Sequence, residues 1–196
     1  PTVAANLKKP EWLNDINNYH NKGDVQDWND KFWSQNGDFF GLDDIKTENP
    51  VVIDGFAKVY SDWVNDYGID GFRIDTAKHV DDAFLAKWWA KVTALSTTKP
   101  KLFAFGEVYD SNPWYLSSFV RTGKLPSVLD FNFKDGALDY ASGGDATSLA
   151  GVFAMDDLYT SANTSAYNLA TFLGNHDMGR ASNLLLGKGV STADLL

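Results

Sequence analysis

Short apolar segments alternate with longer amphipathic segments along most of this chain of 196 residues. The alternation constrains the fold more than any other feature, because strands separated by helices of about ten or more residues pair in parallel. The predicted strands are residues 69–75, 101–107, 128–133 and 169–174. The sequence therefore predicts an α/β fold with a parallel sheet.

The predicted helices carry the signals with which helices begin and end. Asn49 and Pro50 are a capping residue and a proline suited to the first helical position, apolar residues then recur every three or four positions, and Gly68 closes the pattern. A second helix begins after Asp81, which is also a capping residue. Further helices are predicted over 113–121 and about 145–159.

The first 48 residues differ from the rest of the chain. They are rich in Asn, Asp, Gly and aromatic residues and show no sustained periodicity, so we interpret most of them as loop. The sequence thus predicts two parts, a loop-rich region over 1–48 and an α/β region over 49–196.

Composition excludes several classes of function. The 26 acidic side chains outnumber the 17 basic ones and give a net charge of -9, so we expect no nucleic acid partner. No apolar run approaches the ~18 residues that span a bilayer, so we expect no membrane partner. The absence of cysteine excludes disulfides, thiolate metal sites and cysteine nucleophiles.

Charged and polar residues gather where the predicted strands end. Arg73 and Asp75 lie at the end of the first strand, Glu107 ends the second, and His176 and Asp177 follow the fourth. The carboxyl ends of parallel strands meet at one edge of a sheet, where barrels of this kind place their active sites. We therefore expect these side chains to form one site.

The carboxylates of this site have different surroundings in the sequence. Arg73 and Asp75 share one face of their strand, and a neighbouring guanidinium lowers the pKa of a carboxyl, so Asp75 is interpreted as a base or nucleophile. Glu107 follows an apolar strand and Gly106, a setting in which a buried carboxyl tends to keep its proton near neutrality. Glycoside hydrolysis uses one charged and one protonated carboxyl. Alone, Asp75 also fits a helix cap or an ion pair.

Three motifs carry a family resemblance. GFRIDTAKHV (71–80), FGEVYD (105–110) and FLGNHD (172–177) resemble, in order and spacing, regions that define the α-amylase family of glycoside hydrolases. Upstream, YHNKGDVQDWND (19–30) and FFGLDDI (39–45) resemble the end of that family's small inserted domain and the approach to its third barrel helix. The resemblance covers most of the chain, from about Asn14 to Arg180.

The resemblance implies a role for each residue of the site. Asp75 matches the family's nucleophile and Arg73 the arginine beside it. Glu107 matches the general acid and base. Asp177 matches the third carboxylate, which holds sugar hydroxyls, and His176 the histidine that strengthens contacts in the transition state.

Four further residues are candidates, three of them from the resemblance and Tyr109 from its place after Glu107. Lys78 matches a lysine on the leaving-group side of the site, and Tyr109 lies where its ring could stack on a sugar. Asp44 matches a carboxylate ligand of the family's structural calcium ion, and His79 matches a residue that binds the ion through its main-chain oxygen. A structural role stays open for Lys78, as a solvated helix-start residue, and for His79, as a packing or capping residue.

The resemblance also implies a fold that this chain fills only in part. A complete (β/α)8 TIM barrel takes about 250 residues, whereas the sequence predicts four strands. We expect a partial barrel of about strands four to seven, preceded by the tail of the inserted domain. The family's first region is not found before Asn14. We therefore expect the chain to be the middle of a longer enzyme, inactive alone and inclined to associate with the missing parts of its own barrel.

The expected activity is retaining cleavage of α-1,4-glucosidic bonds in starch-like glucans, with an α-glucan oligosaccharide or polysaccharide as partner. Three alternatives stay open: an α-glucosidase or transglycosylase of the same family, a barrel that binds sugar or a partner protein without catalysis, and a zinc hydrolase. The zinc reading would use Asp75, His79, Glu107, His176 and Asp177 as ligands. The resemblance implies an extracellular or periplasmic location, because polymeric starch does not cross a membrane.

Overall fold

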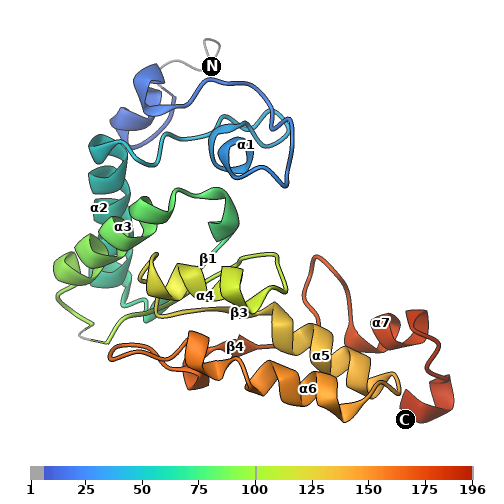
Figure 1. The fold of residues 1–196 in the computed structure, drawn as a ribbon. Helices are drawn as coiled ribbons and strands as arrows, with labels where there is room; N and C mark the ends of the chain where they lie inside the picture. Colours follow the sequence, from blue (N-terminus) through green and yellow to red (C-terminus); the bar gives the residue numbers. More distant parts are fainter. Residues whose placement is uncertain (1–6, 100, 196) are drawn as a thin grey trace.

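A computed structural model of the chain describes residues 7–99 and 101–195. Its centre is a four-stranded parallel sheet whose spatial order follows the chain order (Figure 1). The strands are β1 (Gly71–Ile74), β2 (Phe103–Gly106), β3 (Ser127–Asp130) and β4 (Ala170–Thr171). The parallel α/β fold that the sequence predicts is therefore confirmed, and parallel strands in chain order are the arrangement expected of a partial TIM barrel.

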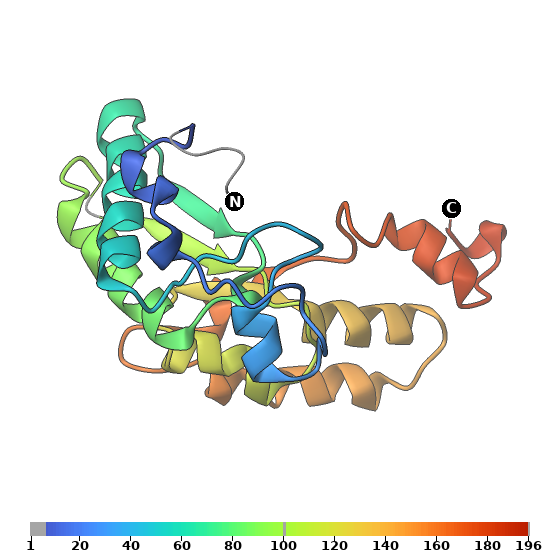
Figure 2. The same ribbon diagram turned by 90° about the horizontal axis from the view of Figure 1, so that it is seen from above.

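Helices lie between and beyond the strands. The α-helices are α1 (Lys31–Asn36), α2 (Pro50–Tyr67), α3 (Asp82–Leu95), α4 (Pro113–Arg121), α5 (Phe131–Ala141), α6 (Ala146–Phe153) and α7 (Ala181–Gly187). Helices α2 and α3 stand beside β1 at one end of the molecule, and α5, α6 and α7 lie at the opposite end with the end of the chain (Figures 1 and 2). Short 3-10 helices are η1 (Glu11–Asn14), η2 (Ile16–Asn18), η3 (Ala77–His79), η4 (Asp156–Leu158), η5 (Ala166–Asn168) and η6 (Thr192–Leu195).

The predicted helix signals act as expected in α2 and α3. The Asn49 side chain accepts a hydrogen bond from the N–H of Val51 at 3.0 Å, and Gly68 ends α2 with a φ of 69°. The Asp81 side chain accepts from the N–H of Phe84 at 3.0 Å and so begins α3. None of the helices in the described residues is long and apolar enough to cross a membrane.

The main core lies between the sheet and the helices that stand against it. Val52 of α2 and Leu85 of α3 are fully buried there together with Leu116 of α4. Ala104 and Val128 contribute from the two central strands. Burying a side chain of the size of valine or leucine contributes about 1.5–3 kcal/mol, so this core fixes the strands and with them the edge on which the predicted site residues lie.

Several element boundaries differ from the prediction. The strand predicted over 128–133 ends at Asp130, because the side chain of Asp130 accepts the N–H of Phe133 at 2.9 Å and begins α5 there. The helix predicted to run to about residue 159 ends at Phe153, and the strand predicted over 169–174 is reduced to β4. Trp63 belongs to the apolar pattern that predicts α2, yet it is 49% exposed on that helix.

The region before α2 is mostly irregular, as predicted, but it contains α1, which the sequence does not predict. The Asp30 side chain begins this helix by accepting the N–H of Trp33 at 3.0 Å. The buried face of α1 contacts η3, which follows β1. The division of the chain at residue 48 stays a prediction.

Candidate functional site

The pairing of β1 with β2 places two of the predicted carboxylates side by side. Ile74 lies opposite Gly106 in the parallel register, so Asp75 and Glu107 follow at the same level of the sheet. The N–H of Glu107 donates to the carbonyl of Ile74 at 2.8 Å and continues the ladder by one bond. Both side chains therefore start from the carboxyl edge of adjacent strands.

A single guanidinium joins these two carboxylates. One nitrogen of Arg73 donates to Oδ1 of Asp75 at 2.5 Å, and the other lies 3.0 Å from Oε2 of Glu107. The hydrogen bond from Arg73 is the main cause that lowers the pKa of Asp75, as the sequence predicts, and the same bond raises the pKa of Arg73. Asp75 is thus held in its charged form.

The two carboxylates differ strongly in exposure. The Asp75 side chain is 68% exposed, whereas the Glu107 side chain is 8% exposed. Oε2 of Glu107 also accepts the main-chain N–H of Thr76 at 3.1 Å. Glu107 is therefore an enclosed carboxyl between two donors, while Asp75 is open toward solvent.

Thr76 has an unusual backbone conformation. Its φ of 46° and ψ of 37° lie in the left-handed region, which a β-branched residue rarely adopts and which costs about 1–3 kcal/mol. The carbonyl of Thr76 accepts the N–H of His79 at 2.8 Å, which closes η3 directly after it. This left-handed residue turns the chain sharply after Asp75 into η3, and its N–H bonds to Glu107 where that turn begins.

The third carboxylate comes from the loop that follows β4. The side-chain oxygen of Asn175 accepts the N–H of Asp177 at 2.9 Å, and its carbonyl accepts the N–H of Gly179 at 2.9 Å. A Cβ at Gly174 would lie 2.3 Å from the carbonyl oxygen of Gly179, so the loop closes this tightly only with glycine there. Nε2 of His176 lies 3.3 Å from Oδ2 of Asp177.

All three carboxylates line one cavity of about 550 Å³. Asp75 and Glu107 form its side toward β1 and β2, and Asp177 with His176 comes from the loop after β4. His176 also contributes to the lowering of the pKa of Asp75, and Asp177 contributes to the raising of the pKa of Arg73. The structure thus brings the predicted carboxylates together, while their roles stay predictions.

Lys78 and Tyr109 line the same cavity, but Lys78 is engaged by protein groups. Its ammonium donates to the carbonyl of Tyr109 at 3.2 Å, lies 3.4 Å from Oδ2 of Asp110, and sits 5.7 Å from the ring centroid of Tyr115. The Tyr109 residue is 58% exposed, and its ring lies 5.0 Å from that of Phe131. Lys78 therefore holds the loop after Glu107, whereas the ring of Tyr109 is open to a ligand.

An aromatic wall, whose members sequence reasoning did not assign to the site, completes the cavity. It consists of Trp28, Phe39 and Phe40, with ring centroids 4.9 Å apart for Trp28 and Phe39 and 5.6 Å apart for Trp28 and Phe40. Phe40 is 78% exposed. These residues come from the irregular N-terminal region, where no periodic pattern marks which aromatic side chains face a site.

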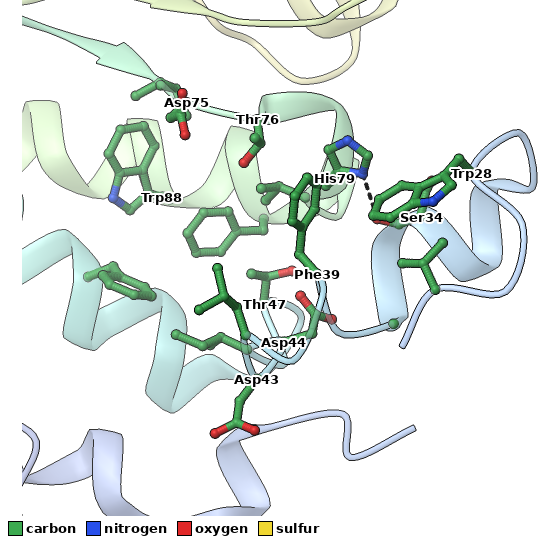
Figure 3. Close-up of a pocket in the computed structure, with 18 of the residues that line it drawn as sticks. Trp28, Ser34, Phe39, Asp43, Asp44, Thr47, Asp75, Thr76, His79 and Trp88 are labelled. Carbon is green, nitrogen blue, oxygen red and sulfur yellow. Dashed lines mark hydrogen bonds between the residues drawn. The ribbon is translucent and has the colours of Figure 1, made fainter. Parts of the chain in front are cut away.

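A second cavity of about 530 Å³, shown in Figure 3, adjoins the first, because Asp75, Thr76 and His79 line both. Asp44 and His79, the two candidate calcium ligands, both line it. Oδ2 of Asp44 lies 2.5 Å from Nδ1 of His20, and burial is the main cause that raises the pKa of Asp44. The imidazole of His79 donates to the carbonyl of Ser34 at 3.1 Å, and burial lowers its pKa.

These two residues do not make a metal site by themselves. Calcium takes six to eight oxygen ligands, and within residues 7–99 and 101–195 no group of three or more His, Cys, Asp or Glu side chains is arranged to hold a metal ion. The same finding removes the support for the zinc hydrolase reading, which needs such a group around Asp75 and His176.

Known proteins resemble the chain in sequence and in fold. The family model described as "Alpha amylase, catalytic domain" matches residues 4–195. An alpha-amylase of Streptomyces lividans is 48% identical over 188 residues, which are 94% of this chain and 20% of that protein. A cyclomaltodextrin glucanotransferase of Klebsiella oxytoca is 28% identical over 181 residues, 85% of this chain and 27% of that protein.

Solved structures agree with these matches. The alpha-amylase of Geobacillus thermoleovorans, solved with acarbose, superimposes with a TM-score of 0.78 at 26% identity and covers 92% of this chain and 40% of that one. The chain thus spans from 20% to 40% of the length of these relatives. Three findings agree: the motifs lie at the carboxyl edge of a parallel sheet, the family model matches, and the fold is shared. The chain therefore belongs to the alpha-amylase family of glycoside hydrolases and forms part of its catalytic domain.

Proposed function

We propose that the chain supplies the reacting carboxylates of a retaining enzyme that cleaves α-1,4-glucosidic bonds in starch-like glucans. The observation that carries the proposal is the contrast between Asp75, exposed and charged beside Arg73, and Glu107, enclosed one strand away. Retaining glycosidases need such a pair of carboxyl groups on either side of the scissile bond. Asp177 lines the same cavity and supports the proposal.

In the proposed first step, the Asp75 carboxylate attacks the anomeric carbon while Glu107 gives its proton to the glycosidic oxygen. The bond between the anomeric carbon and that oxygen breaks, and an ester between the sugar and Asp75 forms. In the second step, Glu107 takes a proton from water, the water oxygen attacks the anomeric carbon, and the ester bond breaks. Two inversions leave the configuration retained. Asp177 and His176 hold sugar hydroxyls.

The activity is proposed for the complete barrel, and the isolated chain is proposed to be inactive. In the full-length protein, Asp75→Asn and Glu107→Gln should each abolish cleavage of starch. The matched controls are Asp62→Asn and Glu11→Gln, which make the same chemical changes on the surface of α2 and in η1, and they should retain cleavage. Near-normal cleavage by Asp75→Asn or Glu107→Gln would contradict the proposal.

Hydrolysis is the proposed outcome, with sugar transfer as the alternative within the family. The alternative is favoured by one relative, which is a cyclomaltodextrin glucanotransferase. Product analysis on maltooligosaccharides distinguishes the two: hydrolysis gives only shorter linear sugars, whereas transfer gives cyclic or longer ones. Binding of the sugars without any change in their length would favour the non-catalytic barrel instead.

A structural calcium ion is a separate proposal, with Asp44 and the main-chain oxygen of His79 as two of its ligands and the remaining oxygens supplied by other groups. A lower Tm of the full-length protein in a calcium chelator supports it, and an unchanged Tm contradicts it. We also propose an extracellular or periplasmic location, because the proposed polymeric substrate does not cross membranes. Fractionation of cells that produce the protein tests the location.

A further inference from the structure

Helix α1 is fastened to the segment that follows Asp75 by bonds from two buried residues. The imidazole of His79 donates to the carbonyl of Ser34 at 3.1 Å, as Figure 3 shows, and Nε2 of Gln35 donates to the carbonyl of Val80 at 3.0 Å. Ser34 is 5% exposed and Gln35 is 8% exposed. A buried amide donor of this kind is costly to lose, because its partner carbonyl would then lack a bond.

A third contact continues this line of bonds toward the surface. The ammonium of Lys31, at the first position of α1, donates to Oδ2 of Asp82 at 2.6 Å. These three bonds therefore attach α1 to His79, Val80 and Asp82. Together they connect α1 to the whole path from η3 to the start of α3.

The far end of that path contacts the proposed acid and base. Thr76 adopts a left-handed conformation, with a φ of 46°, and its N–H donates to Oε2 of Glu107 at 3.1 Å. A threonine that nothing restrains adopts the right-handed helical or the extended backbone region instead. The conformation persists only where the surroundings impose it, and the bonds to α1 restrain the chain just beyond it.

We propose that α1 is a latch that holds the Thr76–Val80 segment against Glu107, with Gln35 as its main positioning residue. This inference rests on the proposed function, since it assigns to the latch the placement of the proposed acid and base. Gln35 touches no reacting atom. It acts through Val80 and the strained turn at Thr76 on the donor that orients the Glu107 carboxyl.

The kinetic test is made in the full-length protein. Gln35→Met keeps the length of the side chain and removes its donors, and it should lower kcat about tenfold with KM nearly unchanged. The control is Asn36→Ala on the same helix, whose side-chain amide bonds only within α1, to the carbonyl of Phe32 at 2.9 Å, and it should keep kcat. Lys31→Met removes the bond to Asp82 at the exposed start of α1 and should lower kcat by less than Gln35→Met does.

A second substitution separates positioning from general damage. Asparagine tolerates the left-handed region far better than threonine, so adding Thr76→Asn to Gln35→Met should restore most of the lost kcat. A purely structural role of Gln35 would not produce such a rescue. Equal kcat in Gln35→Met and Asn36→Ala, or a loss that Thr76→Asn does not restore, would overturn the inference.

A third measurement does not depend on activity. Hydrogen exchange at the N–H of Thr76 should be slow in the unchanged protein and in Asn36→Ala, and at least tenfold faster in Gln35→Met. Equal exchange rates in the unchanged protein, Asn36→Ala and Gln35→Met would overturn the latch, whether or not Glu107→Gln abolishes cleavage. Faster exchange in Gln35→Met supports the latch even where Glu107→Gln still cleaves and the proposed function fails.

Discussion

Replacing Arg73 by methionine removes the guanidinium that joins Asp75 and Glu107, the two carboxylates proposed to react. The guanidinium bonds to Asp75 at 2.5 Å and lies 3.0 Å from Glu107. Methionine keeps much of the length and the apolar stem of arginine, so the change is mainly electrostatic. We expect a large loss of activity with a modest loss of stability.

The two halves of this interaction contribute unequally. Because the Asp75 side chain is 68% exposed, its ion pair with Arg73 is worth less than about 1 kcal/mol after screening by solvent. The Glu107 side chain is 8% exposed, and losing a charged partner there costs about 1–3 kcal/mol. A total of about 1–4 kcal/mol, if it falls on the transition state, lowers kcat/KM roughly 5- to 900-fold.

The same substitution should change the pH dependence. A carboxyl whose folded pKa is lowered stabilises the protein above its unfolded pKa, and this contribution is lost as the pH falls through the folded pKa. Arg73 is the main cause that lowers the pKa of Asp75, so Arg73→Met should raise that pKa. Asp75 would then take up its proton at a higher pH, and the acid limb of kcat/KM should move to higher pH with it. The assay is cleavage of a maltooligosaccharide across pH.

The matched control is Arg121→Met, which removes an exposed arginine in the last turn of α4, away from the carboxyl edge of the sheet. It should leave both kcat/KM and the acid limb unchanged. A wild-type rate and an unmoved acid limb in Arg73→Met would refute the electrostatic reasoning.

Three stability predictions are measured by urea unfolding. Gly106→Ala places a methyl group 2.9 Å from the Leu125 side chain, so it should lower the free energy of unfolding by about 1–3 kcal/mol and displace Glu107, whereas Gly151→Ala, with nothing within 4 Å, should not lower it. Leu85→Ala empties a fully buried position and should cost about 2–5 kcal/mol. Asp81→Ala removes the cap of α3 and should cost about 0.5–2 kcal/mol.

Each of these predictions has an outcome that would contradict it. Equal free energies of unfolding for Gly106→Ala and Gly151→Ala would show that the Leu125 side chain moves aside for the added methyl group without cost. A loss below about 1 kcal/mol in Leu85→Ala would mean that the core around α3 collapses around the cavity. Equal losses for Asp81→Ala and Asp81→Asn would exclude capping, because asparagine caps as well as aspartate.

Sequence reasoning succeeded where the signals are local. Helix α4 has the predicted bounds because Asn112 caps it and Pro113 opens it, and both act within one turn. Helix α2 begins and ends as predicted for the same kind of reason, at Asn49 and Gly68. These residues decide the backbone without help from distant parts of the chain.

The prediction was wrong where two local signals compete, or where contacts between distant residues decide the structure. Residues 128–133 alternate in a way that fits a strand, yet the Asp130 side chain caps α5 and ends β3 early. Helix α1 is too short to show a period, and buried contacts of Ser34 and Gln35 hold it. Such contacts do not appear in a reading of neighbouring residues.

The candidate site divides in the same way. The sequence predicts that Asp75 and Glu107 lie at neighbouring strand ends, and the structure places them there, because parallel pairing aligns the carboxyl ends of the two strands. The Thr76 N–H depends on a left-handed backbone that the residue type disfavours. The aromatic wall beginning at Trp28 depends on how the N-terminal region folds over the cavity. Neither is encoded in a periodic pattern.

Trapping the covalent sugar on the protein tests the proposed nucleophile most directly. The full-length protein would be incubated with a fluorinated α-glucosyl fluoride that forms the glycosyl ester faster than water releases it, and its peptides would be analysed by mass spectrometry. We predict one sugar attached to the peptide that contains Asp75, and none in Asp75→Asn. A sugar on a different carboxylate, or cleavage of the reagent with inverted configuration and no labelled peptide, would contradict the assignment.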